Sequence, residues 1–214
     1  MNSNSIEKRQ ASSFQDSLKL LLEGKRAKFD ETVEIAINLD TKLPDVAIRG
    51  FVEAPNGLGR NISIAVFCDS KLDDVAYAGG DDLIEKFAKG EIKKCKVCIA
   101  TKKYVPLISA KIGKILGRKR IMPDARFGTV VEDDSALIKV VESFKKGRMN
   151  FRANKNVIHC ILGKVSFDPQ ALEENFVTLI REISNLLPAK TRLGRSYLSS
   201  TMSGESFEVK VGNV

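Results

Sequence analysis

Apolar and polar residues alternate in short runs near both ends of the chain. From Thr32 to Leu39 every second position is Val, Ile or Leu, which is the period of a strand with one buried face and one polar face. A similar strand is expected around residues 46–52, two more around a turn within residues 148–167, and the last strands within residues 197–211. Strands of this kind predict a sheet that is covered on one side only.

Helices accompany these strands. Ser13 and Asp16 have the spacing of a capping box, leucines follow at helical intervals, and Gly24 ends the pattern. A second helix is expected from Asp168 onward, with Pro169 in its first turn and an apolar stripe that extends to Leu187. Together with the one-sided strands, these helices predict α+β structure at both ends of the chain.

Between residues 61 and 150 the pattern is different. Residues 62–68 and 95–100 are almost continuously apolar, as in strands that are buried on both faces. Helical periodicity occurs near residues 71–88, 105–116 and 135–146, and Gly79 and Gly80 are interpreted as a break between two helical pieces. Buried strands that alternate with helices predict a parallel α/β unit.

The predicted fold class is therefore α/β and α+β, in two domains. Residues 1–60 and 151–214 form a discontinuous α+β domain, and residues 61–150 form an α/β domain inserted into it. The chain crosses the junction twice, near residues 56–61 and 147–152, in segments that contain glycine. Two such crossings are typical of a hinge between domains.

The composition favours an anionic partner. The 214 residues carry a net charge of +8 and the pI is about 9.3, a balance suited to nucleic acid or another anionic surface. No apolar run approaches the ~20 residues that span a bilayer. The first ten residues are polar, unlike a signal peptide. We therefore expect a soluble cytoplasmic protein with no membrane partner.

Four cysteines are present, and Cys95 and Cys98 form a C-x-x-C pair. A structural zinc site needs four ligands, and the sequence offers only the adjacent His159 and Cys160 and a separate Cys68 besides this pair. The preferred interpretation is a buried strand that uses cysteine as a small apolar residue, with metal or redox chemistry as the alternative. No metal and no cofactor are expected.

Catalytic chemistry is sparse. His159, the only histidine, lies in an apolar segment, where we expect a hydrogen-bonded structural role and not a general base. The chain has no G-x-S-x-G, H-E-x-x-H or P-loop motif, and residues 68–74, after the first buried strand, contain no glycine to cradle a phosphate. No catalytic residue is assigned. An α/β enzyme acting on a nucleotide or an acidic substrate is the alternative function.

Basic residues gather in two regions. Between Lys102 and Arg126 there are eight basic residues and one acid, which indicates either a solvated helix face or an anionic contact. The second group comprises Lys25, Arg26, Lys28, Lys164, Lys190, Arg192 and Arg195. Near the C-terminus, small hydroxyl residues surround Met202. Such a patch fits RNA phosphates and 2′-hydroxyls, or an ordinary edge strand.

Four stretches together resemble one family. They are AKFDETVEIAINL, LGRKRIMPDARFGTV, HCILGKVSF and YLSSTMS, in the order and at about the spacing found in bacterial large-subunit ribosomal protein L-one, the universal uL-one family. The resemblance extends from about residue 14 to the C-terminus. It implies a discontinuous, split β-α-β-like RNA-binding domain and an inserted, Rossmann-like three-layer domain.

The resemblance also implies a function. Members of the family are non-enzymatic proteins that bind large-subunit ribosomal RNA, form the mobile stalk at the tRNA exit site and assist release of deacylated tRNA. Many bacterial members also repress translation of their own operon messenger RNA. We therefore expect a location on the ribosome, these three RNAs as partners, and a monomer when the protein is free. A free regulator that binds only messenger RNA is a further alternative.

The family's RNA-binding surface corresponds here to residues from three segments. They are Lys28, Phe29 and Thr32, then Gly163 and Lys164, and finally Ser200, Thr201 and Met202. Arg118, Lys119 and Arg120 are candidates for secondary RNA contacts. By residue type alone Phe29 could equally be a core aromatic at the start of a strand, and the resemblance favours contact with RNA.

Two places depart from the family pattern. Where the family has Pro-Arg-Gly after Leu-Gly, this chain has Arg118, Lys119 and Arg120, which removes two conformationally special residues and adds charge. Where the family has glycine after Thr-Met, this chain has Ser203. Glycine at a contact surface indicates either positive φ or an approach too close for a Cβ, and Gly204 could supply the flexibility one residue later.

Overall fold

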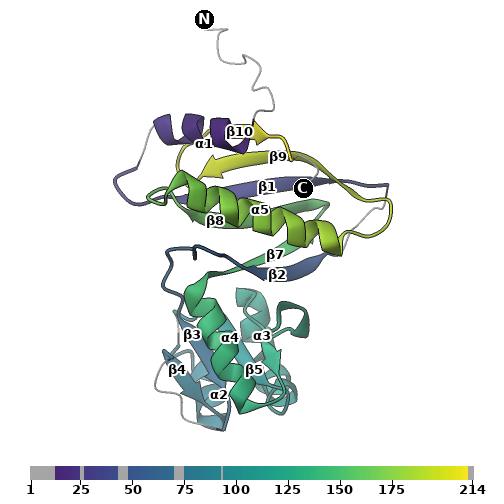
Figure 1. Cartoon of the computed structure of the whole chain (residues 1–214). Helices are drawn as coiled ribbons and strands as arrows, with labels where there is room; N and C mark the ends of the chain where they lie inside the picture. Colours follow the sequence, from purple (N-terminus) through teal and green to yellow (C-terminus); the bar gives the residue numbers. More distant parts are fainter. Residues whose placement is uncertain (1–12, 25–26, 43–47, 70–74, 93, 212–214) are drawn as a thin grey trace, which may run out of the picture. The chain divides into compact units, whose positions relative to one another are not determined.

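The computed structural model describes residues 13–24, 27–42, 48–69, 75–92 and 94–211. Within these residues the protein is mixed α/β, with five α-helices and two sheets (Figure 1). The chain divides into two compact units, which we call the terminal unit (Met1–Gly59 with Gly147–Val214) and the middle unit (Arg60–Lys146). The expected mixed α/β class is confirmed, and each unit has a sheet of its own.

The terminal unit is built on a six-stranded sheet with the strand order β10-β9-β1-β8-β7-β2, in which every neighbouring pair is antiparallel. Its strands are β1 (Thr32–Asp40), β2 (Arg49–Glu53), β7 (Arg148–Asn154), β8 (Val157–Lys164), β9 (Arg192–Ser200) and β10 (Ser206–Val209). The two strands expected within residues 148–167 are present as a hairpin. Lys155 and Asn156 form its turn, both with positive φ, as a tight turn between twisted strands requires.

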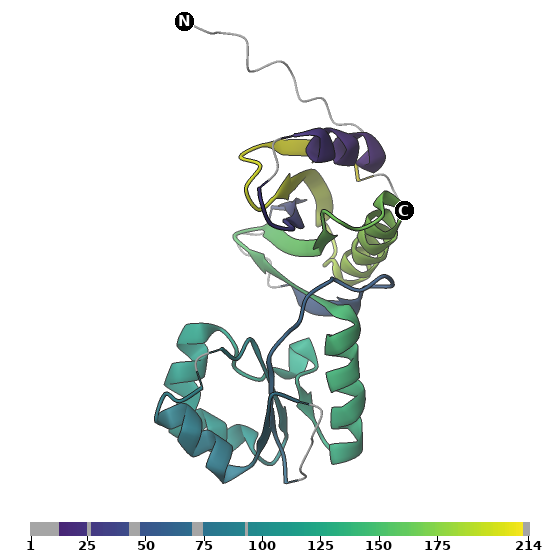
Figure 2. The same ribbon diagram turned by 90° about the vertical axis from the view of Figure 1, so that its left-hand side faces the viewer.

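Two helices, α1 (Phe14–Glu23) and α5 (Pro169–Leu186), cover one face of this sheet (Figures 1 and 2). α1 packs on β9 and β10, α5 packs on β2 and β8, and the rings of Phe14 and Phe176 stack between the helices with centroids 4.5 Å apart. The inward residues of the strands, such as Ile35, are buried beneath them. The opposite face, which we call the open face, carries no described helix of the terminal unit.

Both helices begin where the sequence predicts. The Ser13 hydroxyl accepts a hydrogen bond from the Asp16 amide at 3.2 Å, and the Asp168 carboxylate accepts one from the Gln170 amide at 3.0 Å. These side chains satisfy amide groups that the first helical turn leaves without a partner in the helix. Gly24 directly follows the last residue of α1, also as predicted.

The middle unit has a four-stranded parallel sheet with the order β4-β3-β5-β6. Its elements are β3 (Ile64–Phe67), β4 (Tyr77–Gly79), α2 (Asp81–Ala88), β5 (Val97–Thr101), α3 (Val105–Lys119), a 3-10 turn (Ala125–Phe127), β6 (Val130–Val131) and α4 (Asp134–Gly147). Residues of α2 and α3 form one apolar cluster with the sheet, and residues of α4 form another. Because both faces are covered, the central strands are continuously apolar.

The interpretation of Gly79 and Gly80 as a break between helical pieces is wrong. Gly79 ends strand β4, and α2 begins directly after Gly80. A strand of three residues is too short to show a period, so the pattern alone does not reveal it. β6, with two residues, is absent from the sequence-based expectation for the same reason.

The two segments by which the chain leaves and re-enters the terminal unit touch each other. The Ala54 amide donates to the Gly147 carbonyl at 2.9 Å. A Cβ at Gly147 would lie 2.6 Å from both Gly57 Cα and the Leu58 nitrogen, and φ at Gly147 is 121°. Glycine is required there, because any other residue would clash and would be strained at that φ.

Candidate nucleic-acid interface

The antiparallel sheet brings three segments that are distant in the sequence to one edge, namely the edge at which β1 begins and β8 and β9 end. Thr32 at the start of β1 pairs with Lys164 at the end of β8, and Val33 pairs with both Gly163 in β8 and Ser200 at the end of β9. The segment before β1 and the turn after β9 extend from the same edge, which lies on the left in Figure 1. We call this edge the strand-end surface. It brings together the residues that the family resemblance assigns to the terminal segments.

Two large apolar side chains project into solvent at the strand-end surface. Phe29 is 55% exposed and Met202 is 65% exposed, the highest values among the large apolar residues of the described chain. Lys28 and Thr201 beside them are exposed as well. The interpretation of Phe29 as a core aromatic is therefore wrong, and both apolar side chains are available to a partner.

A buried carboxylate organises this surface. Glu31 is 3% exposed, and its Oε1 accepts a hydrogen bond from the Ala27 amide at 2.7 Å. Its Oε2 accepts one from the Ser200 hydroxyl at 2.7 Å and one from the Met202 amide at 3.0 Å. The carboxylate thus fixes the segment before β1 and the turn after β9 in one geometry. Sequence reasoning did not identify Glu31, because an acidic residue beside a strand gives no signal until its donors are known.

Further hydrogen bonds hold the remaining polar groups of the surface. The Thr32 amide donates to Thr201 Oγ1 at 3.1 Å, and the Thr201 amide donates to the Thr32 carbonyl at 3.2 Å. Lys164 Nζ donates to the Asp30 carbonyl at 2.9 Å and to Thr32 Oγ1 at 3.2 Å. These contacts restrict a lysine that would otherwise sample many rotamers, so less conformational entropy is lost when a partner binds.

Gly163 lies beneath the surface. It is buried, and a Cβ built on it would lie 2.8 Å from Leu172 Cδ2 and 3.0 Å from Phe167 Cδ2. The missing side chain therefore serves the packing of β8 against α5, since a larger residue would force these side chains apart. Any contribution of Gly163 to binding rests on its backbone.

Ser203 differs from the family glycine without backbone strain. The left-handed residue of this turn is Gly204, with φ of 65°, and Ser203 is not among the residues with positive φ. The Ser203 hydroxyl donates to the Glu205 carbonyl at 2.9 Å and lies 3.4 Å from the Ser200 amide, which donates to it. The hydroxyl thus closes the turn from within, and the positive-φ explanation does not apply to this position.

The candidates for secondary contacts lie in the other unit. Arg118 and Lys119 end α3, and Arg120 caps it in the left-handed conformation, with φ of 57° and ψ of 32°. This is the position at which the family has glycine, so the arginine accepts a conformation that favours glycine. All three side chains are exposed, and Lys119 Nζ donates to the Ile92 carbonyl at 3.3 Å. They belong to the middle unit, whereas the strand-end surface belongs to the terminal unit.

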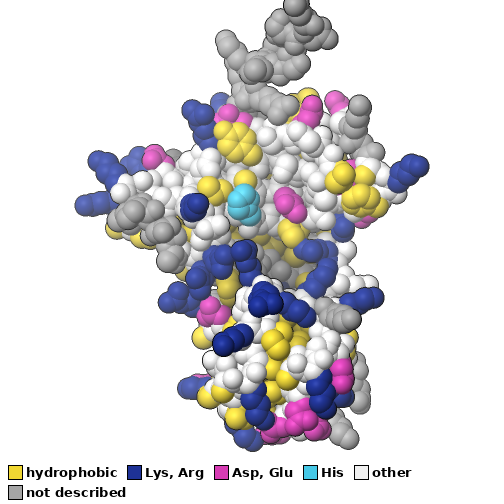
Figure 3. All heavy atoms as spheres, turned by 180° about the vertical axis from the view of Figure 1, so that it is seen from behind, with side chains coloured by type: hydrophobic (Ala, Val, Ile, Leu, Met, Phe, Trp, Pro, Cys, Tyr) yellow, Lys and Arg dark blue, Asp and Glu magenta, His cyan; other side chains and the backbone are white. Residues whose placement is uncertain are grey.

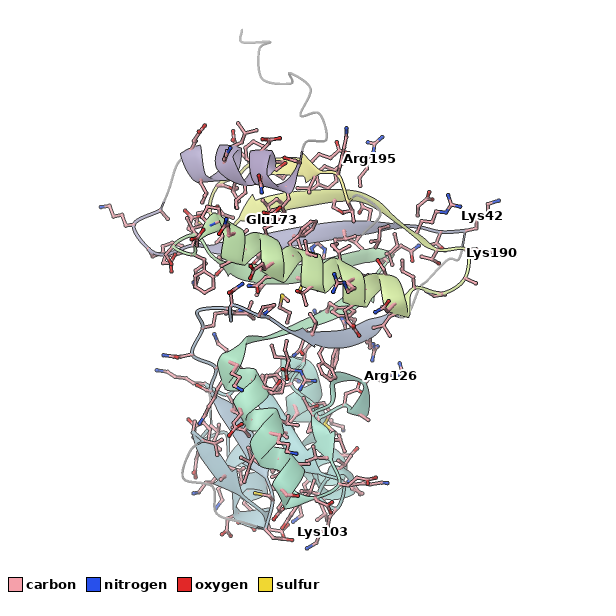
Figure 4. The ribbon with its side chains drawn as sticks, in the orientation of Figure 1. Lys42, Lys103, Arg126, Glu173, Lys190 and Arg195 are labelled. Carbon is pink, nitrogen blue, oxygen red and sulfur yellow. The ribbon has the colours of Figure 1, made fainter. Side chains whose placement is uncertain are left out.

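A basic cluster lies at the opposite end of the same strands. Asp40 at the end of β1 pairs with Arg192 at the start of β9, and both line a pocket of about 590 Å³ together with Lys42 and Lys190. Figure 4 shows the side chains of Lys42 and Lys190 at this end of the sheet. We call this group the basic edge. The sequence alone placed Lys190 and Arg192 in one basic group without Lys42. The pairing of β1 with β9 brings Lys42 close to them.

The open face of the sheet carries the only histidine. His159 pairs with Ala36, which pairs in turn with Tyr197, and the imidazole is exposed on this face (Figure 3). The expectation of a hydrogen-bonded structural histidine within an apolar strand is therefore wrong, because alternate residues of β8 point away from the core. On the same sheet Arg49 and Arg152 are directly opposite on β2 and β7.

Three described polar residues of the middle unit bond to one another beyond the carboxyl ends of its strands. Asp69, which follows β3, accepts a hydrogen bond from the Tyr104 hydroxyl and another from Lys103 Nζ at 2.9 Å. These bonds lower the pKa of Asp69, and the one from Tyr104 contributes most. The same bond raises the pKa of Tyr104 to about 12. Ligands of open α/β sheets bind at this end of the strands, and among the described residues Asp69 there is already bonded to Lys103 and Tyr104.

The described part of the chain offers neither a metal-binding cluster nor a membrane-spanning helix. It contains no group of three or more His, Cys, Asp or Glu side chains placed to hold a metal ion. Among its helices, none combines the length and the apolar character needed to cross a bilayer.

Comparison with known proteins places the chain in a family. Residues 21–204 match the ribosomal protein L1p/L10e family. The chain is 36% identical over 209 residues to the large ribosomal subunit protein uL1 of Coxiella burnetii (strain Dugway 5J108-111), which covers 92% of this chain and 88% of that relative. It is 37% identical over 208 residues to the protein of the same name from Prochlorococcus marinus (strain MIT 9211), with 92% and 86% covered. The resemblance inferred from four short stretches is confirmed, and the chain belongs to the ribosomal protein L1p/L10e family.

Proposed function

We propose that this protein is a structural component of the large ribosomal subunit that binds ribosomal RNA through the strand-end surface. The observation that carries the proposal is the presence of two exposed apolar side chains, Phe29 and Met202, on an edge whose hydroxyl and lysine groups are held by hydrogen bonds. The relatives' name, large ribosomal subunit protein, supports the same assignment. The alternative of an α/β enzyme is set aside, because the family is one of non-enzymatic ribosomal proteins.

Each component of the surface suits RNA. The ring of Phe29 and the thioether of Met202 can lie flat against bases or riboses, and stacking on an aromatic side chain is worth about 1–3 kcal/mol per base. The hydroxyl of Thr201 can contact phosphates and 2′-hydroxyls. Lys164 adds positive charge beside them, which favours the phosphate backbone. The internal hydrogen bonds hold these groups in place before the RNA arrives.

Alanine substitutions test this surface. Phe29→Ala and Met202→Ala are each expected to weaken binding of the full chain to large-subunit ribosomal RNA by about 1–3 kcal/mol, or about 5- to 150-fold, because each removes a stacking contact. Leu20→Ala in α1 and Ile138→Ala in α4 are matched controls, since these side chains are 49% and 50% exposed and are not among the residues assigned to the surface. Filter binding would measure affinity and circular dichroism the fold. Equal losses in test and control variants would contradict the proposal.

We also propose that the two units act as domains of a mobile stalk. In this proposal the terminal unit anchors the protein on ribosomal RNA, and the middle unit is the inserted domain, with the paired segments at Gly57 and Gly147 as the hinge. The stalk assists release of deacylated tRNA from the exit site. The basic edge supports a tRNA contact, because it gathers positive charge away from the strand-end surface.

The tRNA contact can be separated from the ribosomal RNA contact by charge reversal. Lys42→Glu with Lys190→Glu is expected to weaken binding of deacylated tRNA and to leave affinity for ribosomal RNA within about threefold, since the two surfaces lie at opposite ends of the strands. A parallel loss for both RNAs would show that the basic edge contributes only general attraction.

The messenger RNA of the protein's own operon is proposed as a second ligand of the strand-end surface. Because one surface would serve both RNAs, ribosomal RNA should displace the messenger competitively. Simultaneous binding of the two RNAs to one protein molecule would contradict this. A free regulator that binds only messenger is distinguished by sedimentation, since a ribosomal protein is expected to co-sediment with large subunits at moderate salt.

A further inference from the structure

The middle unit holds two cysteine side chains in contact. Cys95 lies two residues before β5, and Cys98 is the second residue of that strand. Their Sγ atoms are 3.7 Å apart and share a hydrogen bond. Both residues are buried, with 7% and 2% of their surfaces exposed, in the apolar cluster that α2 and α3 form with the sheet. The two cysteines of the C-x-x-C motif therefore form a close pair of thiols in the folded protein.

The other two cysteines have no part in this pair. Cys68 packs in the apolar cluster on the opposite face of the same sheet. Cys160 lies in the terminal unit, where burial raises the pKa of its thiol to about 12. All four residues are free thiols, so the protein contains one close pair and two separate, buried cysteines that serve as internal controls.

The two sulfurs of the pair are chemically unequal. The hydrogen bond with Cys98 lowers the pKa of Cys95, although burial opposes this. The same hydrogen bond, together with burial, raises the pKa of Cys98. The positive charge of Lys119 favours the thiolate at both positions, and Lys119 is held nearby by its bond to the Ile92 carbonyl at 3.3 Å. Cys95 is thus suited to attack and Cys98 to resolve, as in known dithiol pairs.

We propose that Cys95 and Cys98 form a reversible dithiol–disulfide pair that reacts with low-molecular-weight disulfides. An S–S bond of ~2.05 Å requires the sulfurs to approach by less than about 2 Å, a movement within reach of side-chain rotation. The proposal does not depend on the RNA-binding function, because it concerns a cluster in the middle unit.

The reaction balances in two steps. The Cys95 thiolate, after losing its proton to solvent, attacks one sulfur of the external disulfide, and the other sulfur leaves as a thiolate. Cys98 then loses its proton, and its thiolate attacks the Cys95 sulfur and expels the second thiolate. The departing thiolates take up the two protons. The protein loses two S–H bonds and gains one S–S bond, while the oxidant is reduced to two thiols; an excess of thiol reverses both steps.

Closure has an electrostatic consequence for the end of α3. It removes the ionisable Cys95 thiol whose thiolate form Lys119 favours, and Lys119 belongs to the Arg118–Arg120 segment in which this chain is more basic than its family. The oxidation state of the pair is therefore linked to the environment of that lysine. Lys119→Met is expected to slow the first step, because the thiolate loses a positive charge that favours it.

The test uses the folded full-length protein and oxidised glutathione, followed by alkylation of remaining thiols and peptide mass mapping. The expected product contains one disulfide, between Cys95 and Cys98, with Cys68 and Cys160 still alkylatable after unfolding. All four cysteines are about equally buried, so access does not separate them. The pair should react at least about tenfold faster than these two controls, because the hydrogen bond with Cys98 lowers the pKa of Cys95 and because Cys98 lies 3.7 Å away to resolve the adduct. Dithiothreitol should restore both thiols.

Single substitutions identify the steps. Cys98→Ser should retain a glutathione adduct on Cys95, whereas Cys95→Ser should leave Cys98 unmodified. The controls Cys68→Ser and Cys160→Ser should form the disulfide as the unmodified chain does.

The proposal is overturned if the native protein forms no Cys95–Cys98 disulfide, if the disulfide forms only after denaturation, or if Cys68 and Cys160 react as fast as the pair. Circular dichroism of each variant shows whether the fold is retained, and the unmodified chain decides the outcome if a variant does not fold.

Discussion

The two sheets of this protein differ in what they leave exposed. The antiparallel sheet of the terminal unit is covered by α1 and α5 on one face, whereas the parallel sheet of the middle unit lies between α4 and the pair α2 and α3. Crossover helices bury a parallel sheet on both sides, while an antiparallel sheet can keep one face and its strand ends in solvent. The residues proposed to bind ribosomal RNA are found where the strands end in solvent.

The two units also differ in what accompanies the polar groups at the ends of their strands. In the middle unit Asp69 is bonded to both Lys103 and Tyr104, so charge and hydrogen-bonding capacity are used internally. At the strand-end surface the polar groups are also bonded to one another, yet Phe29 and Met202 remain exposed. Exposed apolar side chains on a rigid polar frame, more than charge alone, distinguish a surface built for a partner.

The largest expected effect comes from separating the two units. Residues 1–59 joined to residues 147–214 by a short linker should bind large-subunit ribosomal RNA within about threefold of the full chain, because the strand-end surface lies wholly in that unit. The isolated middle unit should bind at least about a hundredfold more weakly, which corresponds to ~2.7 kcal/mol. Circular dichroism would establish that both pieces fold. Tight binding of ribosomal RNA by the isolated middle unit would contradict the assignment of the main binding surface to the terminal unit.

The next largest effect is expected at Glu31. Glu31→Ala removes the acceptor for the Ala27 amide, the Ser200 hydroxyl and the Met202 amide, so the surface loses its fixed geometry. We expect affinity for ribosomal RNA to fall about tenfold or more, since buried donors without acceptors cost about 1–3 kcal/mol each.

Two further variants make the Glu31 prediction specific. Glu31→Gln keeps one oxygen acceptor and should lose less affinity than Glu31→Ala. Glu34→Ala removes an exposed carboxylate three residues further along, in strand β1, and should leave affinity unchanged. An equal loss for Glu34→Ala, or none for Glu31→Ala, would mean that the buried carboxylate does not organise the surface.

The pH dependence of Tyr104 tests the internally paired group of the middle unit. Its bond to Asp69 raises the pKa of Tyr104 to about 12, above the ordinary value of ~10. A raised pKa favours the protonated hydroxyl in the folded state. Its stabilising contribution is therefore present below pH ~10 and is lost as the pH rises through about 12.

Tyrosinate absorbance should show this late titration in the unmodified protein and not in Tyr104→Phe. Affinity for ribosomal RNA should be the same in both, because the group belongs to the middle unit. A difference spectrum that titrates near the ordinary value would show that the hydrogen bond to Asp69 does not persist in solution.

The smallest effect is expected at Ser203. Ser203→Gly should change RNA affinity by less than about threefold, because the backbone at this position needs no positive φ. Ser203→Ala removes the hydroxyl that donates to the Glu205 carbonyl at 2.9 Å, so a loss of about 0.5–1.5 kcal/mol in the free energy of unfolding is expected. Thermal melts and binding isotherms would separate the two effects. A tenfold change in affinity for Ser203→Gly would contradict the correspondence of this turn with the family surface.

Much of the fold follows from local sequence because its determinants lie within a few residues. The caps at Ser13 and Asp168 and the hairpin of β7 and β8 depend on neighbours along the chain. Continuous apolar runs predicted the parallel sheet that is buried on both faces, and alternating runs predicted the sheet that is covered on one side. The shortest strands, β4 and β6, escaped prediction because two or three residues carry no period. The sequence also placed the RNA-binding candidates, through motifs whose residue types resemble one family.

The tertiary structure decided what depends on strand register. Glu31 receives hydrogen bonds from Ser200 and Met202, which lie 169 and 171 residues further along the chain. His159 is exposed because its position in β8 points to the open face, and Lys42 joins the basic edge through the pairing of β1 with β9. A shift of one residue in register would exchange the two faces of a strand, and the packing of the whole sheet against its helices selects the register. Sequence patterns therefore indicated which residues form the longer strands, and only the packed sheet determined which distant side chains meet.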